Sequence, residues 1–247
     1  MDRALYVAMS GAAQTLRQQA VNNHNIANAS TTGFRAELLA SAAASVEGPG
    51  LPTRVNTAPE ALGFNARGGS IQQTGRDLDV AMNEDVWLAV QAPDGSEAYT
   101  KAGDLQIDAY GQLRTGAGYA VLGDGGPLAV PPSQRILIGG DGTISVQPTG
   151  SGPEALASVG RLRVVRGTPD SLQRGEDGLM RAKPGKVLEP ASGAVVTSGA
   201  LEGSNVNLPE AMVTMISLAR QFEMQMKLMK AAEDNAAASS SLTRLTG

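Results

Sequence analysis

The chain has 247 residues, of which 42% are hydrophobic and 3% aromatic, so its core must be built mainly from aliphatic side chains. A net charge of −4 without any basic block argues against a general nucleic-acid-binding protein, which would present a basic surface. The absence of cysteine excludes disulfides and thiolate metal sites. No apolar run approaches the roughly 18 residues of a membrane span, so we expect no membrane insertion. The first residues are amphipathic rather than continuously apolar, and we expect no cleaved signal peptide.

The N-terminal segment predicts one long helix over residues 3–28, because it contains no proline and its only glycine is Gly11. An apolar stripe follows the 4, 3, 4 spacing of a coiled-coil seam at Leu5, Met9, Ala12 and Leu16. Gln19 and Asn23 weaken this stripe, so the helix should need a partner. We expect Gly33 to end the helical region, because glycine adopts the left-handed conformation at low cost.

Residues 36–66 read as an extended linker. An Ala/Ser run is followed by Gly48, Pro49, Gly50 and Pro52, a composition that favours little regular structure.

The segment 67–200 changes character and predicts a central, mainly antiparallel β domain. Turn signals recur at Asp94-Gly95, Tyr110-Gly111, Asp124-Gly125, Asp141-Gly142 and Asp177-Gly178. Short strand-like runs lie between them: Leu78–Met82, Val86–Val90, Ile136–Ile138, Ile144–Val146 and Leu162–Val164. No strand–helix alternation appears, which argues against a parallel α/β sheet.

The C-terminal segment 201–247 predicts a second helix. Asn207 and Glu210 resemble a capping box, and Pro209 falls in the first turn, where its missing N–H does little harm. The helix should run to about Ala238. Its apolar stripe keeps the 4, 3 rhythm over three heptads at Leu208, Met212, Met215, Ala219, Phe222, Met226 and Met229.

Together these elements predict an α+β fold in which the N- and C-terminal helices pair as a coiled-coil-like seam and flank the β domain. The expected segments are 1–35 for the N-terminal helix, 36–66 for the linker, 67–200 for the β domain and 201–247 for the C-terminal helix. An apolar helical face is usually the core of its own domain. Here the narrow seam, the matching helix at the other terminus and the adaptability of methionine favour an assembly surface.

Catalytic and metal chemistry find little support in the sequence. His24 is the only histidine and has no nucleophile near it, so a solvated or packing role is expected. The acidic residues 77–85 lack the glycine and distal glutamate of a calcium loop. The glycine clusters at 123–126 and 139–142 are not followed by Lys-Ser or Lys-Thr, so they predict hairpin turns rather than phosphate loops. We therefore expect no metal, no cofactor and no catalysis.

Two alternatives place a different function in the β domain. One is a hydrolase that uses paired carboxylates among Asp77, Asp79 and Asp104; the other is a sugar- or cell-wall-binding module on a helical stalk.

Three ordered motifs resemble bacterial flagellar basal-body rod and hook proteins. They lie in residues 25–35, in Tyr99–Leu105 with Asp108–Leu113, and in Leu201–Asn207. With the terminal helices the resemblance covers nearly the whole chain. The motif residues carried by the two ends are Asn25, Asn28, Thr32, Gly33, Phe34, Ser204, Asn205 and Asn207.

Within this family the run Arg220–Lys227 is most similar to proximal-rod members, because Gln225 stands where distal-rod and hook relatives would have Asn. The resemblance implies a non-enzymatic subunit of the axial driveshaft for motility. Its implied partners are further copies and other rod subunits, with the flagellar export apparatus as the route of delivery. Paired terminal helices would form an inner tube spanning the periplasm, and the β domain would lie outside it.

Overall fold

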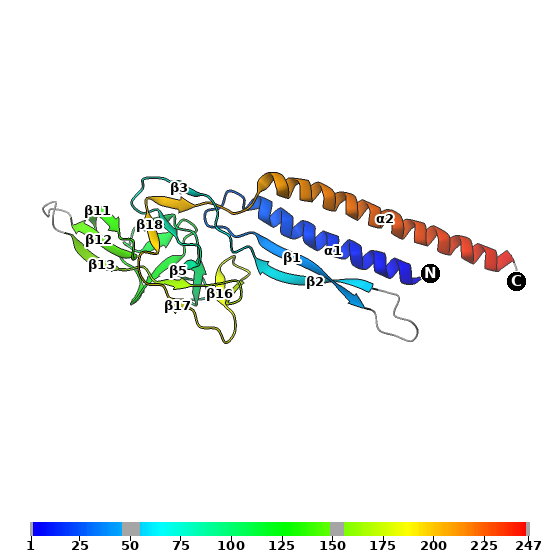
Figure 1. The fold of residues 1–247 in the computed structure, drawn as a ribbon, viewed down its shortest axis with the longest axis horizontal. Coiled ribbons are helices and arrows are strands. Elements are labelled where there is room, and N and C mark those ends of the chain that lie inside the picture. Colours follow the sequence, from blue (N-terminus) through cyan, green and yellow to red (C-terminus); the bar gives the residue numbers. More distant parts are fainter. Residues whose placement is uncertain (1, 46–54, 149–155, 246–247) are drawn as a thin grey trace. The chain divides into compact units, whose positions relative to one another are not determined.

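The computed structural model describes residues 2–45, 55–148 and 156–245 (Figure 1). The chain divides into two compact units. The helical unit consists of Met1–Ala27, Glu37–Leu62 and Asn207–Gly247, and the β unit consists of Asn28–Ala36 and Gly63–Val206. Residues 28–36 thus belong with the β unit, although they directly follow the N-terminal helix in sequence.

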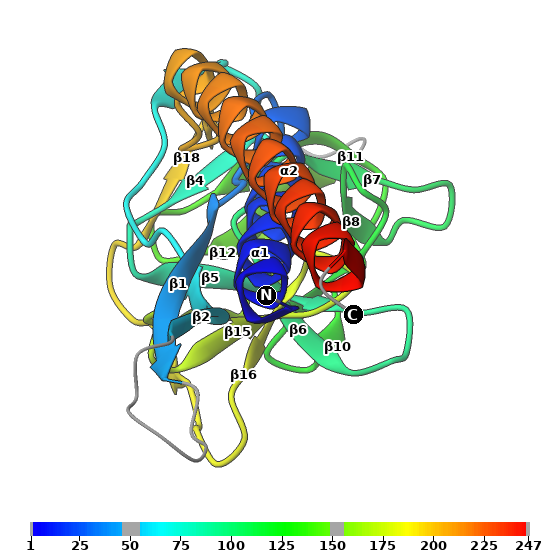
Figure 2. The same ribbon diagram turned by 90° about the vertical axis from the view of Figure 1, so that its right-hand side faces the viewer.

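The helical unit contains α1 (Asp2–Ala27) and α2 (Leu208–Leu245). The two helices lie side by side and run in opposite directions (Figures 1 and 2). This confirms the predicted pairing of the terminal helices and the α+β class. Neither helix, over the described residues, is long and apolar enough to cross a membrane.

Helix α2 extends beyond its predicted end near Ala238. The serines at 239–241 remain helical, and the Ser241 hydroxyl donates to the carbonyl of Ala238 at 2.7 Å. Serine is only a moderately poor helix former, and no glycine or proline occurs between Pro209 and Gly247. The serine run therefore does not stop the helix.

The segment predicted to be an irregular linker instead contributes two strands, β1 (Glu37–Ser45) and β2 (Val55–Phe64), which pair in a two-stranded sheet. The expectation of little regular structure is wrong for these residues; residues 46–54 lie outside the described part. Composition alone gave the wrong result because the start of β1 is fixed by a side-chain contact with α1, twelve residues earlier. The Asn25 amide donates to the Glu37 carbonyl at 3.0 Å, and the Glu37 N–H donates to Asn25 Oδ1 at 2.8 Å.

The β unit contains a ten-stranded sheet with the order β15-β16-β6-β5-β9-β8-β7, in which β10 pairs with β9 and β14 pairs with β5 and β17. A three-stranded sheet β11-β12-β13 and the pairs β18-β4 and β19-β3 complete it. The strands are β3 (Ile71–Gln73), β4 (Val80–Met82), β5 (Val86–Gln91), β6 (Glu97–Thr100), β7 (Leu105–Ile107), β8 (Leu113–Thr115), β9 (Ala120–Gly123), β10 (Gly126–Pro127), β11 (Ser133–Ile138), β12 (Thr143–Pro148), β13 (Ala157–Arg161), β14 (Val164–Arg166), β15 (Leu172–Arg174), β16 (Met180–Ala182), β17 (Glu189–Pro190), β18 (Val196–Ser198) and β19 (Ala200–Glu202).

All five predicted turns connect antiparallel strands and are confirmed. They join β5 to β6, β7 to β8, β9 to β10, β11 to β12 and β15 to β16. Two strand predictions are partly wrong. In the run Leu78–Met82, Leu78 lies in a turn and β4 begins at Val80. The run Leu162–Val164 is split, because Leu162 forms an isolated bridge to Gly123 and β14 begins at Val164.

Strand β5 is the centre of the β unit's core. Val86, Leu88 and Val90 pack into one hydrophobic cluster, while Trp87 and Ala89 pack into a second. Both faces of the strand are therefore covered, which explains why its sequence is continuously apolar rather than alternating.

Candidate assembly surface and motif junction

The predicted seam residues of α1 lie along one stripe but differ in exposure. Ala12 is buried and Leu5 is half-buried, on the covered side. Met9 and Leu16 are each 49% exposed. Only half of this stripe is therefore used within the chain, and the other half forms an apolar face open to solvent.

The stripe of α2 divides in the same way. Its half-buried members are Met215, Phe222 and Met229, and its exposed members are Leu208, Met212, Ala219 and Met226. Ala211 and Leu218 are buried, whereas Met212 and Ala219 are exposed. The contact with α1 therefore uses Ala211 and Leu218. At these two positions the buried stripe of α2 is thus shifted by one residue from the predicted stripe.

Polar side chains that the sequence patterns missed lie between α1 and α2. The Thr15 hydroxyl lies 3.2 Å from Gln225 Oε1 and 3.0 Å from the Gly11 carbonyl, so its single hydrogen is shared between two acceptors. A Cβ on Gly11 would approach Gln225 Nε2 to 2.9 Å. Gly11 therefore makes room for the glutamine side chain. The only sequence feature that marked this contact was Gly11, the single glycine of α1.

The ends of both helices are fixed by asparagines of the family motif. Asn22 also contributes, since its amide donates to the Ala211 carbonyl at 2.8 Å. At the start of α2, Asn207 Oδ1 accepts the Glu210 N–H at 3.4 Å, which confirms the asparagine half of the predicted cap. Asn28 ends α1, where its side chain accepts from the Thr31 hydroxyl at 3.1 Å.

In the β unit, residues 33–36 pair with residues 202–205, and we call this pairing the motif junction. The Gly33 N–H donates to the Glu202 carbonyl at 2.8 Å, and the Asn205 N–H donates to the Phe34 carbonyl at 3.2 Å. Gly33 has a φ of 68°, and a Cβ there would lie 2.2 Å from the Lys101 carbonyl carbon. Gly33 thus has the predicted left-handed backbone conformation. It allows the backbones of residues 33 and 101 to approach closely and does not end α1, which ends at Ala27.

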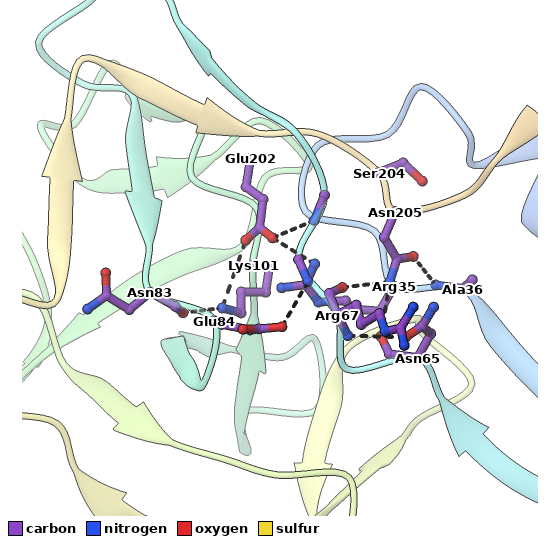
Figure 3. A network of polar contacts seen from close by, with 12 residues as sticks. Arg35, Ala36, Asn65, Arg67, Asn83, Glu84, Lys101, Glu202, Ser204 and Asn205 are labelled. Carbon is purple, nitrogen blue, oxygen red and sulfur yellow. Dashed lines mark hydrogen bonds and ion pairs between the residues drawn. The ribbon is translucent and has the colours of Figure 1, made fainter.

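Asn205 connects three backbone segments at this junction (Figure 3). Its Oδ1 accepts the Ala36 N–H at 2.7 Å, and its Nδ2 donates to the carbonyls of Asn65 at 3.0 Å and Arg67 at 2.8 Å. Ser204 has a local role, since its hydroxyl accepts the Val206 N–H at 3.3 Å. The motif amide therefore holds the segment after α1 and the segment before α2 on the same β unit.

Phe34 is buried beside a cation. The Arg174 guanidinium lies 4.7 Å from the centre of the Phe34 ring and donates to the Arg35 carbonyl. Thr32 is half-buried in the preceding turn.

A buried ion cluster lies behind the junction (Figure 3). Arg35 Nη1 is 2.7 Å from Glu202 Oε1, and Lys101 Nζ is 3.8 Å from Glu202 Oε2. The Gly69 N–H also donates to this carboxylate at 2.9 Å. Two buried cations thus share one buried carboxylate, and the Lys101 ammonium in addition donates to the Asn83 carbonyl.

The pKa of Lys101 is lowered to about 8, chiefly because burial penalises its charged form. The Glu202 carboxylate opposes this lowering, whereas the Arg35 charge adds to it. The ammonium also lies 5.3 Å from the centre of the Trp87 ring. These three charged residues occur in the predicted motifs, but no sequence pattern links them, since they come from segments far apart.

The carboxylates considered for a hydrolase lie in the β unit, where two of them take part in contacts that hold the fold together. Asp79 and Asp104 are backbone bridge partners, and Asp79 accepts the Thr74 hydroxyl at 2.7 Å and pairs with Arg76 at 3.5 Å. Burial raises the pKa of Asp104. The Asp77 side chain is exposed. His24, considered as a base, lies 3.4 Å from the Glu37 carboxylate in the helical unit.

Comparisons with known proteins agree with this arrangement. Residues 5–35 match the family described as flagella basal body rod protein, residues 81–146 match the flagellar hook protein FlgE/F/G D1 domain, and residues 197–242 match the flagellar basal body rod FlgEFG protein C-terminal family. These matches define the class: an axial protein of the bacterial flagellum with paired terminal helices and a β unit.

Individual relatives narrow the assignment. The chain is 48% identical to the flagellar basal-body rod protein FlgF of Escherichia coli over the full length of both chains. It is 46% identical to FlgF of Salmonella typhimurium, covering 95% of this chain and 96% of the relative, and 29% identical to the rod protein FlgG of Bacillus subtilis at the same coverages. The chain belongs to the FlgF-like family of flagellar basal-body rod proteins.

Proposed function

We propose that this chain is a structural subunit of the flagellar basal-body rod and joins its neighbours through the exposed faces of α1 and α2. The observation that carries the proposal is the divided seam. Five of the eleven regularly spaced apolar residues are buried or half-buried between the two helices of one chain, and the other six remain on the surface.

The exposed half has the chemistry of a packing surface. Met9 and Leu16 on α1, with Met212 and Met226 on α2, are each between 47% and 49% exposed. Burying a large apolar side chain contributes roughly 1.5–3 kcal/mol before entropic costs. Four such residues supply a useful driving force for adding one subunit, and methionine adapts to neighbours that are not identical.

A surface on α1 that packs against a different surface on α2 of the next copy is heterologous. Such contacts generate open helical filaments unless the rotation closes into a ring. This geometry suits a rod, in which each subunit has neighbours above and below. The proposed partners are further copies of this chain and other rod subunits. We further propose a proximal position in the rod, delivery by the flagellar export apparatus and assembly in the periplasm.

A matched pair of substitutions tests the surface. Met226→Gln removes an exposed apolar side chain without adding charge, and Lys227→Gln changes the adjacent exposed residue off the stripe. In cells that lack their own copy, we expect Met226→Gln to lower the amount of the chain in isolated basal bodies, and Lys227→Gln to leave it near the level of the unmodified chain. Equal incorporation of both variants would contradict the proposed surface.

A further inference from the structure

The methionines of this chain are unevenly distributed. Nine occur in the sequence, and five of them lie between residues 212 and 229 of α2. Two others, Met82 and Met180, belong to the core of the β unit and are each 3% exposed. The same side chain therefore occurs in two opposite environments within one molecule, which allows its reactivity to be compared directly.

Solvent exposure separates the helical methionines further. Met9, Met212, Met224 and Met226 are 49%, 48%, 58% and 47% exposed, and we call these four the exposed methionines. Met215 and Met229 are half-buried on the side of α2 that faces α1. On a helix, residues 14 apart lie on nearly the same side. Met212 and Met226 therefore share one edge of α2, and Met215 and Met229 share another.

A thioether reacts with peroxides without any other protein group. The methionine sulfur takes one oxygen atom from hydrogen peroxide and is oxidised by two electrons; the O–O bond breaks, and the peroxide leaves as water. The product, methionine sulfoxide, is polar and accepts hydrogen bonds. Because oxidant must reach the sulfur, exposure governs which thioether reacts.

We propose that the four exposed methionines are an oxidation site of the free subunit, and that peroxide-class oxidants convert them to sulfoxides that prevent assembly. The second half of this statement rests on the proposed function. Met9, Met212 and Met226 belong to the stripe through which the chain is proposed to join its neighbours. A sulfoxide oxygen at such a contact has no donor on an apolar neighbour, and leaving it unsatisfied is costly. Subunits already in the rod would be protected, because the same contact would cover their sulfur atoms.

The first test measures selectivity on the purified, full-length chain. Dilute hydrogen peroxide is added, samples are taken over time, and sulfoxide at each methionine is quantified by peptide mass spectrometry. We expect the exposed methionines to react at least about tenfold faster than Met82 and Met180, with Met215 and Met229 between them. In urea the differences should disappear. Uniform oxidation of all methionines in the folded chain, at unchanged Trp87 fluorescence, would overturn the proposal.

The second test measures the consequence in cells that lack their own copy. A variant with Met9→Leu, Met212→Leu, Met224→Leu and Met226→Leu keeps apolar volume and cannot be oxidised at these sites. Because three of these residues belong to the proposed assembly surface, each protein is compared with its own untreated level. Under sublethal peroxide we expect the amount of the unmodified chain in isolated basal bodies to fall severalfold from that level, since an unsatisfied sulfoxide oxygen weakens the contact. The leucine variant should keep its untreated level.

The same ratio of treated to untreated amounts in the two proteins, whether both fall or neither does, would overturn the oxidation proposal. Failure of the unmodified chain to enter basal bodies without peroxide would instead contradict the proposed function. The two failures are therefore distinguishable.

Discussion

The Arg35 guanidinium and the Glu202 carboxylate lie 2.7 Å apart with side chains that are 0% and 4% exposed. Arg166 and Asp85 form an ion pair at the same distance, but their side chains are 52% and 47% exposed. Breaking a buried pair leaves an uncompensated charge in the interior, whereas an exposed partner is simply rehydrated. The two pairs therefore provide a controlled comparison within one β unit.

Glu202→Gln should strongly lower the free energy of unfolding. It removes the one carboxylate within 4 Å of both Arg35 and Lys101 in the described cluster. The expected loss is about 3–5 kcal/mol. Asp85→Asn, which breaks the exposed pair, should cost less than about 1 kcal/mol. Urea unfolding followed by Trp87 fluorescence measures both, and comparable losses would show that the buried cluster is not the stronger contact.

The lowered pKa of Lys101 gives a pH dependence of defined sign. In the folded chain this pKa is about 8, mainly because of burial, while an unfolded lysine has an ordinary pKa of about 10.4. Between these values the unfolded chain binds more protons than the folded chain, so the stability rises with pH. The cost of charging Lys101 is fully present below pH 8. From pH 8 to 10 we expect the stability to rise by about 2 kcal/mol.

Tyr99 limits the upper end of this window. Burial raises its pKa to about 12, so above pH 10 the unfolded tyrosine loses its proton first and the stability falls again. The measurement is therefore made between pH 8 and 10, on the unmodified chain and on Lys101→Met. The variant should lack the rise. A rise of the same size in Lys101→Met would assign it to another group.

Gly33→Ala should destabilise the β unit through two effects that a second glycine separates. At Gly33 the φ is 68° and a Cβ would lie 2.2 Å from the backbone of Lys101. At Gly75 the φ is 72° and no atom lies within 4 Å of the corresponding position. Gly75→Ala therefore reports conformational strain alone, about 1–2 kcal/mol.

Gly33→Ala should cost clearly more than Gly75→Ala, about 3 kcal/mol or above, because the backbone of residues 33 and 101 must also separate. Thermal unfolding of the two variants provides the comparison. Equal changes in melting temperature would mean that the close approach at Gly33 is relieved without cost.

The Thr15–Gln225 contact should fix the register of α1 against α2. A polar contact within an otherwise apolar helical seam specifies register at some expense of stability. Gln225→Leu should therefore keep the helices paired but allow more than one alignment. Since the chain has no cysteine, spin labels can be attached at Arg17→Cys and Ser217→Cys, two exposed positions. We expect a broader distance distribution in Gln225→Leu than in the unmodified sequence.

The control for this experiment is Gln221→Leu, one turn earlier on the exposed side of α2. It adds the same apolar side chain away from the seam and should leave the distance distribution unchanged. A narrow distribution in Gln225→Leu would show that the register is determined by the apolar residues alone.

The sequence predicted those elements whose determinants are local. The hairpin turns confirm this, because a glycine at positive φ determines a tight turn with few residues; Gly95, Gly142 and Gly178 of three Asp-Gly turns have φ values of 82°, 84° and 79°. The burial of Arg35 could not be predicted, because its partner Glu202 is distant in sequence and no pattern connects them. Strand β1 was missed because its first residue is held by the side chain of Asn25, a contact that the composition of the segment does not encode.

The seam of α2 shows a different limit. Apolar residues occur at Ala211 and Met212 and again at Leu218 and Ala219, so two stripes one residue apart fit the same spacing. One residue turns a helix by about 100°. Periodicity therefore identified the helix and its need for a partner. The choice of buried stripe depends on contacts with α1, such as the hydrogen bond from the Asn22 amide to the Ala211 carbonyl, which a single sequence does not reveal.

Phe222→Asp is the sharpest test of the terminal helices. Phe222 is half-buried in α2, midway between Met215 and Met229, and is the aromatic residue of the predicted seam. A carboxylate there must lose hydration or remain protonated, which costs several kcal/mol, of the order of 2–5. We expect the β unit to fold normally, because Phe222 belongs to the helical unit. Incorporation into basal bodies should be lost and the cells should be non-motile.

Lys230→Asp places the same side chain at an exposed position on α2 and should be much milder, since a hydrated charge costs little. Total and exported amounts of both variants are measured alongside motility, so that a defect in assembly is separated from degradation. A motile Phe222→Asp strain, or equal defects in the two variants, would show that assembly does not depend on the half-buried side of α2 that packs against α1.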